Sequence, residues 1–78
     1  MRLWAVEWHS RNRLDGDRRH LIWAPHRPCW PQLFTTRREC REFIEREYGY
    51  IRHRPDLRAE PHGWRMPRAV RVRIEAER

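Results

Sequence analysis

The chain of 78 residues contains no lysine, so all 18 of its basic side chains are arginine. Its 11 acidic residues leave a formal net charge of +7. Arginine binds phosphate and carboxylate groups through a planar fork of donors and stacks on nucleobases, and lysine does both less well. The imbalance therefore predicts an anionic partner, although codon usage in a GC-rich genome is an alternative explanation of the arginine bias.

Cysteine, glycine and long apolar runs are also scarce. The two cysteines do not make a disulfide framework, and the three glycines form no Gly-rich phosphate loop. The longest apolar runs, such as residues 21–24, are too short to cross a bilayer, and no secretory signal opens the chain. We therefore expect a single cytoplasmic domain over residues 1–78, not an enzyme, with no cofactor, no membrane partner and no small-molecule substrate.

Residues 3–9 and 19–24 are rich in aromatic and β-branched side chains, which predicts two strands. Asp15 and Gly16 between them form a strong turn signal, because glycine adopts positive φ without strain. If these two residues make the turn, Trp8 faces Trp23. One face of the hairpin then collects Trp4, Val6, Trp8, Leu21 and Trp23. The other face collects His9, Arg11, Arg13, Arg18 and His20, with Ile22 as the apolar exception.

A helix is predicted over residues 37–48. Thr36 and Glu39 have the spacing of a capping box, and Gly49 stands where a helix commonly ends in the left-handed conformation. An apolar stripe recurs at helical spacing in Cys40, Phe43, Ile44 and Tyr48. The segment holds four arginines and four glutamates, so we interpret it as a neutral brace that covers the sheet, not as a contact surface.

Prolines shape the rest of the chain. Residues 25–33 contain three prolines and predict a loop. The prolines within residues 49–68 exclude a long helix or a central strand there, although residues 55–60 fit one helical turn. Residues 69–77 alternate apolar and charged side chains, which predicts a half-buried strand. The order β-β-α-β predicts an α+β fold, an antiparallel three-stranded sheet with one helix packed on one face.

The face of this sheet that the helix leaves free is predicted to be basic, because outward arginines of the last strand join those of the hairpin. Guanidinium groups neutralise phosphates and release counterions, and a two-stranded ribbon fits a major groove. The sequence thus predicts binding to the phosphate backbone of nucleic acid. The predicted nucleic-acid-binding residues are His9, Arg11, Arg13, Arg18, His20, Arg71 and Arg73.

A protein partner is the alternative. Trp64, with His62 and Arg65 beside it in the Pro-bounded segment 61–67, would anchor a host protein. The protein would then be an inhibitor or modulator of a host machine. A lone tryptophan close to a strand is more typical of a core residue, however.

Metal binding and nucleophilic catalysis have weaker signals. His26 and Cys29 are close together, with Cys40 and His20 nearby in the sequence, but the second close ligand pair of a zinc site is missing. Cys29 beside His26 also resembles a thiolate pair, although such neighbours in a Pro-rich loop are usually incidental. No metal site and no catalytic residue are predicted.

Two stretches carry a resemblance to known proteins: residues 33–41, Leu-Phe-Thr-Thr-Arg-Arg-Glu-Cys-Arg, and residues 61–67, Pro-His-Gly-Trp-Arg-Met-Pro. With them the chain resembles the short arginine-rich uncharacterised proteins encoded by phages and prophages of GC-rich bacteria. That resemblance implies a transcriptional regulator or an inhibitor of host defence. The predicted architecture also resembles the sheet-plus-helix DNA-binding domains of phage integrases and of a class of plant transcription factors. In those domains the helix follows all three strands, whereas here it precedes the third.

Overall fold

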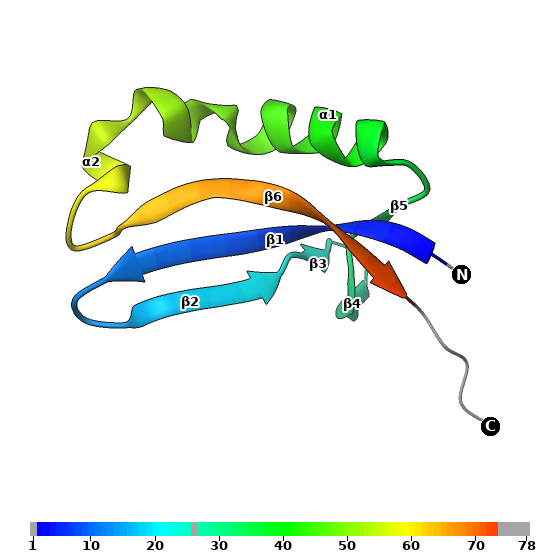
Figure 1. Ribbon diagram of the computed structural model, residues 1–78, viewed down its shortest axis with the longest axis horizontal. Coiled ribbons are helices and arrows are strands. Elements are labelled where there is room, and N and C mark those ends of the chain that lie inside the picture. Colours follow the sequence, from blue (N-terminus) through cyan, green and yellow to red (C-terminus); the bar gives the residue numbers. More distant parts are fainter. Residues whose placement is uncertain (1, 26, 74–78) are drawn as a thin grey trace.

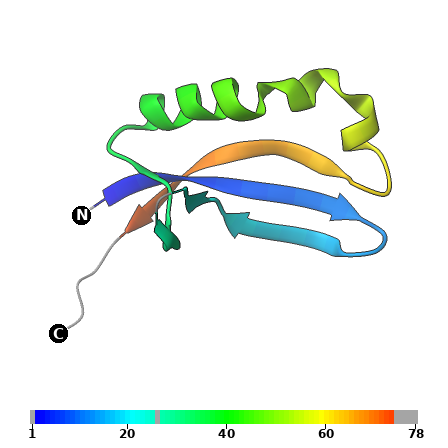
Figure 2. The ribbon, with the colours of Figure 1, turned by 180° about the vertical axis from the view of Figure 1, so that it is seen from behind.

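The computed structural model describes residues 2–25 and 27–73, with the backbone alone for residues 27–29. Figures 1 and 2 show a twisted sheet with the main helix lying along one side of it. The α+β class, the antiparallel pairing and the single main helix are confirmed, but the sheet has four strands where three were predicted. No helix in the described part of the chain is long and apolar enough to cross a membrane. The elements are β1 (Arg2–Asn12), β2 (Gly16–Leu21), β3 (Trp23–Ala24), β4 (Arg27–Pro31), β5 (Leu33–Phe34), α1 (Arg37–Tyr48), the 3₁₀ helix η1 (Gly49–His53), α2 (Pro55–Arg58) and β6 (Trp64–Arg73).

The central strand β1 pairs with β6 on one side and with β2 and then β5 on the other. The N–H of Ile22 donates to the carbonyl of Val6 (2.9 Å), and β5 takes up the pairing at the neighbouring Ala5. β2 and β5 are therefore one edge strand that residues 23–32 interrupt. These residues leave the sheet as the β3–β4 ribbon, whose base is closed by the N–H of Gln32 donating to the carbonyl of Ile22 (2.8 Å). The predicted loop over residues 25–33 is thus wrong, because short strands occupy most of it.

The β1–β2 hairpin has a different register from the predicted one. Trp8 pairs with His20 in place of Trp23, a shift of three residues. The turn comprises residues 13–15, and Gly16 follows it with φ of 73°. Because the shift is odd, each β2 side chain lies on the face opposite to the one predicted for it.

The helix α1 has the predicted bounds, and Thr36 caps it as expected. The hydroxyl of Thr36 accepts from the N–H of Glu39 (3.1 Å) and donates to the Glu39 carboxylate (3.0 Å). The buried side chains of Val6, Cys40 and Ile44 form the core between helix and sheet. The predicted left-handed helix end at Gly49 is wrong. Its φ is −58°, and the chain continues into η1, where Ile51 is fully buried.

The last strand begins at Trp64 instead of residue 69, and it contains Pro67. Proline fits here because β6 pairs with β1 alone and is therefore an edge strand, and because the register shifts between Glu7 and His9 on β1, opposite this position. The expected helical turn is present as α2. The predicted strand residues 74–77 lie outside the described residues.

The capping hydrogen bond of Thr36 leads to a first testable prediction. Replacing Thr36 with alanine leaves the N–H of Glu39 without its acceptor, so we expect the free energy of unfolding to fall by about 1 kcal/mol. For a domain of this size that loss lowers the melting temperature by roughly 4–8 °C. Thr35→Ala is the matched control, since the Thr35 hydroxyl donates to Glu39 (3.0 Å) but accepts no helix N–H. Equal losses in the two variants, measured by thermal unfolding, would contradict the capping role.

Candidate anion-binding surface

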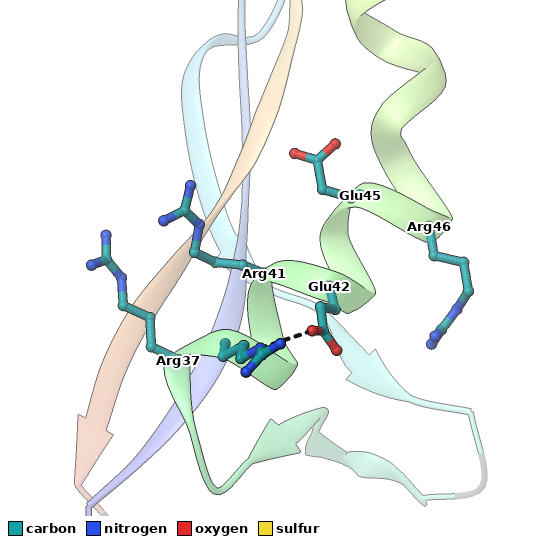
Figure 3. A pocket seen from close by; sticks show the side chains of 6 residues that line it. Arg37, Arg41, Glu42, Glu45 and Arg46 are labelled. Atoms are coloured by element: carbon teal, nitrogen blue, oxygen red, sulfur yellow. Dashed lines mark hydrogen bonds and ion pairs between the residues drawn. The ribbon is translucent and has the colours of Figure 1, made fainter.

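The outward face of α1 carries a shallow, open hollow between side chains of this helix alone. Arg37 and Arg41 extend to the same side of the helix, over β6, whereas Arg46 extends to the other side (Figure 3). Residues four apart share a helix face, so this common direction follows from the sequence spacing. The hollow is lined by Arg37, Arg38, Arg41, Glu42, Glu45 and Arg46.

A second hollow, of about 230 Å³, lies between α1, η1 and β6. It shares Arg37, Arg41 and Glu45 with the first, so the two are continuous. Arg52 from η1 and Arg68 from β6 complete its basic lining. The four arginines come from three elements, of which α1 and η1 are consecutive in the sequence and β6 is separate. We call them the arginine groove: Arg37, Arg41, Arg52 and Arg68.

One carboxylate, that of Glu45, lines the arginine groove. Arg52 donates two hydrogen bonds to it, one to each oxygen. These bonds, with the charges of Arg52 and Arg41, hold the pKa of Glu45 below its ordinary value, so the carboxylate is ionised at neutral pH and Arg52 neutralises it. Arg37, Arg41 and Arg68 form no ion pair with any described residue. The groove therefore carries positive charge that no neighbouring carboxylate balances.

Two arginine side chains, those of Arg37 and Arg71, lie near the Trp4 ring at the N-terminal end of α1. The Cζ of Arg37 lies 5.9 Å from the centroid of the Trp4 ring, and the Cζ of Arg71 on β6 lies 5.3 Å from the same centroid. Each cation is attracted to the face of the indole ring, so Trp4 holds two guanidinium groups near this end of α1.

The placement of these arginines is unfavourable for the helix itself. Arg37 and Arg41 are like charges four residues apart, an arrangement that destabilises a helix by roughly 0.2–0.5 kcal/mol. Arg37 also lies in the first turn, where the positive end of the helix macrodipole disfavours a cation. A bound polyanion would offset both effects.

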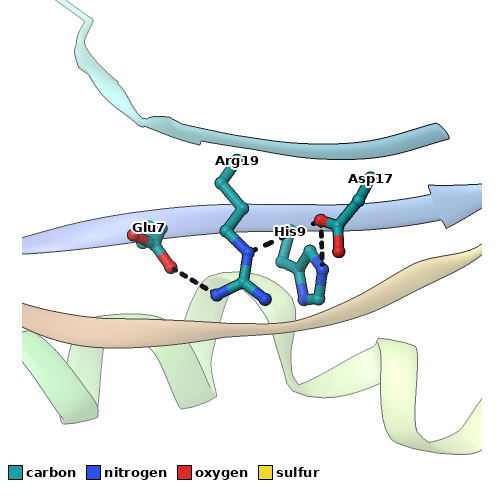
Figure 4. A network of polar contacts seen from close by, with 4 residues as sticks. All are labelled: Glu7, His9, Asp17 and Arg19. Atoms are coloured by element: carbon teal, nitrogen blue, oxygen red, sulfur yellow. Dashed lines mark hydrogen bonds and ion pairs between the residues drawn. The ribbon is translucent and has the colours of Figure 1, made fainter. Parts of the chain in front are cut away.

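The residues predicted to form one basic sheet face are not together. His9 and Arg11 do lie on the face away from α1, but two carboxylates share that face (Figure 4). His9 Nε2 is 2.9 Å from Asp17 Oδ1, and Arg19 lies 3.5 Å from Asp17 and 3.9 Å from Glu7. The acids offset much of the positive charge that was predicted for this face.

The other members of the predicted set lie elsewhere. Arg13 is in the turn, where its N–H donates to the carboxylate of Glu60 (3.1 Å). Arg73 pairs with Arg2 where β6 ends. The register and the ring contacts place the remaining three on the α1 side of the sheet: Arg18, His20 and Arg71. The prediction of a single face is wrong, because the register shift reverses the faces of Arg18 and His20 and because Arg71 pairs with Trp4 on the α1 side. The role of each residue in binding stays a prediction.

Trp64, the predicted protein anchor, is half-buried in an aromatic cluster. Its ring centroid lies 5.1 Å from that of Trp8 and 5.7 Å from that of His62. Arg65 donates to the carbonyl of Arg58 (3.2 Å). Trp64 is therefore already packed against the sheet, which makes it a poor anchor for a partner.

The cysteine and histidine signals lead to no site among the described residues. Cys40 is fully buried, its Sγ donates to the carbonyl of Ala5 (3.4 Å), and burial raises the pKa of its thiol. His26 and the side chain of Cys29 lie outside the described residues. Within residues 2–25 and 27–73, no three His, Cys, Asp or Glu side chains are arranged to hold a metal ion.

Comparison of the chain with protein-family models, with curated proteins and with solved structures found no significant match. The phage resemblance of residues 33–41 and 61–67 thus stays a prediction from the sequence.

Proposed function

We propose that this protein binds the phosphate backbone of nucleic acid through the arginine groove. The observation that carries the proposal is the uncompensated charge of Arg37 and Arg41, beside a hollow between α1 and β6 that Arg52 and Arg68 also line. Guanidinium groups fork onto phosphate oxygens, and their binding releases the counterions condensed on a nucleic acid. The hollow on α1 continues the basic surface from this groove, so a backbone that enters the groove has further arginines along its path.

The surface differs from the open sheet face predicted from the sequence. On the open face, Glu7 and Asp17 lie beside the basic residues and engage them. In the arginine groove the one acid is already neutralised by Arg52. A phosphate in the groove therefore meets net positive charge, whereas one on the open face meets a mixed charge pattern.

A host protein remains the alternative partner, as an inhibitor of phage or prophage origin would require. Its predicted contact residues were His62, Trp64 and Arg65. The packing of Trp64 against Trp8 removes the aromatic anchor from that hypothesis. The arginine groove needs no such anchor, because a polyanion is held by charge along its length.

The proposal is tested by fluorescence anisotropy with labelled DNA and RNA oligonucleotides over a range of salt concentrations. We expect micromolar or tighter binding at about 50 mM salt, with a slope of log K against log salt near −3 for about three to four phosphate contacts. A polyglutamate peptide serves as the control polyanion. No binding to any oligonucleotide at about 50 mM salt, or equal binding to polyglutamate, would contradict the proposal.

A further inference from the structure

A cleft of about 300 Å³ opens on the flank of α1 opposite to the arginine groove. Phe43 and Tyr48 of α1 form one wall, and Trp23 of β3 forms another. The Trp23 side chain is 56 % exposed, although tryptophan is among the most apolar residues of the chain. The lining of the cleft is mostly apolar: Ile22, Trp23, Pro25, Phe43, Glu47 and Tyr48.

The ribbon that carries Trp23 is not needed to complete the sheet. Ile22 hydrogen-bonds to Val6, and Leu33 pairs with the adjacent Ala5, so the edge strand would be continuous without residues 23–32. Figures 1 and 2 both show the ribbon projecting from the β2 side of the sheet. The β3–β4 ribbon exposes a tryptophan, which lowers solubility, and among the described residues it adds no hydrogen bonds to the main sheet. Both observations favour a binding role for the ribbon.

The chemistry of the cleft suits a nucleobase. Trp23 offers an exposed aromatic face on which any base can stack, and such platforms combined with basic residues are typical of proteins that bind single strands. Arg46 lies at the rim, with its Cζ 5.8 Å from the Phe43 ring centroid and its Nε 3.5 Å from the Glu47 carboxylate. The Glu47 carboxylate can accept a hydrogen bond from the amino group of a base.

Arg46 also connects the cleft to the proposed backbone path. It lines the hollow on the outward face of α1, which continues into the arginine groove through Arg37 and Arg41. A strand lying across α1 would thus have its phosphates among arginines and one base turned toward Trp23. In a duplex both faces of each base are covered by neighbouring bases, so no base is free to enter the cleft.

We infer that the cleft between α1 and β3 holds an unpaired nucleobase stacked on Trp23, and that the protein therefore prefers single-stranded to duplex nucleic acid. This inference rests on the proposed function, because the arginine groove supplies the backbone contact that delivers the base.

The test compares three ligands of equal length: a single-stranded oligonucleotide, the same strand with abasic sites in place of its bases, and a duplex. The abasic strand keeps the phosphates and loses every stacking partner. We expect the native protein to bind the single strand about 5- to 100-fold more tightly than the abasic strand, as stacking of one base on an aromatic side chain implies. Trp23→Ala is expected to abolish that difference.

Trp30→Ala is the matched control, because Trp30 is also exposed (44 %) and on the same ribbon but does not line the cleft. It is expected to keep the preference for the single strand. Unchanged binding of the Trp23→Ala protein, or an equal loss in both variants, would overturn the assignment to the cleft. Equal affinity of the native protein for single strand, abasic strand and duplex would overturn the inference and leave the proposed function intact. Absence of binding to all three would instead refute the proposed function.

Discussion

Replacing Gly63 with alanine is expected to lower the free energy of unfolding by roughly 3 kcal/mol or more, since backbone strain and overlap add together. Gly63 has φ of 62°, a conformation that residues with a side chain rarely adopt. A Cβ at this position would lie 1.9 Å from the carbonyl oxygen of Arg11, a backbone atom that cannot rotate away. The loop before β6 touches β1 here, and the N–H of Arg11 donates to the carbonyl of Gly63 (2.8 Å).

Gly16→Ala provides the control. Gly16 has a similar φ of 73°, but nothing lies within 4 Å of its would-be Cβ. We expect this variant to lose only about 1 kcal/mol, the strain of the conformation without the overlap. Chemical denaturation of both variants measures the difference. Equal losses would mean that the loop before β6 does not press against β1 as described.

The contact at Gly63 also bears on the proposed binding surface. Asn12 donates to the carbonyl of His62 (3.0 Å), which adds a second tie between the loop and the end of β1. These ties fix where β6 begins and so help to place Arg68 beside α1. Loosening them should weaken nucleic-acid binding as well as stability.

Features that depend on neighbours in the sequence were predictable. The start of α1 follows from Thr36 and Glu39, whose side chains interact within one turn. The helical turn of α2 follows from Pro55, which favours the first position of a helix. The 3₁₀ helix η1 that follows α1 was not predictable in this way, because it depends on the burial of Ile51 against the rest of the fold.

The predicted register of the hairpin was wrong because the turn was assigned to the wrong residues. The Asp15–Gly16 pair fits a two-residue turn, but the side chain of Asn12 accepts from the N–H of Asp15 (2.7 Å) and begins the turn earlier. Asparagine is common at the first position of such turns, so this signal was present in the sequence. The β3–β4 ribbon had no comparable signal, because β3 is only two residues long and the five residues of β4 include Pro28 and Pro31, which favour a loop.

The arginine groove was missed because the charge of α1 was counted as a total. Four arginines and four glutamates cancel on average, but Glu42 is engaged by Arg38 (3.2 Å) and Glu45 by Arg52. The like charges of Arg37 and Arg41 at helical spacing were the available hint. Their meeting with Arg68 depends on how β6 packs beside α1, which no local pattern determines.

The double variant Arg37→Gln with Arg41→Gln is expected to bind single-stranded nucleic acid roughly tenfold more weakly at about 100 mM salt, since two phosphate contacts are lost. The slope of log K against log salt should become shallower by about 1.5. Glutamine keeps a good helix former at both positions, and removing the like charges and the cation at the positive end of α1 relieves repulsion. The melting temperature is therefore expected to stay the same or to rise.

Arg11→Gln with Arg13→Gln removes the same charge from the hairpin and tests the surface predicted from the sequence. We expect this variant to keep its affinity within about twofold, because only long-range charge changes. If the hairpin variant binds more weakly and the Arg37→Gln, Arg41→Gln variant does not, the binding surface is the open face of the sheet. The Arg37→Gln, Arg41→Gln variant is expected to lose affinity while its stability is unchanged or increased. That result, seen in this variant alone, would indicate that Arg37 and Arg41 occupy positions unfavourable to the helix because a polyanion binds there.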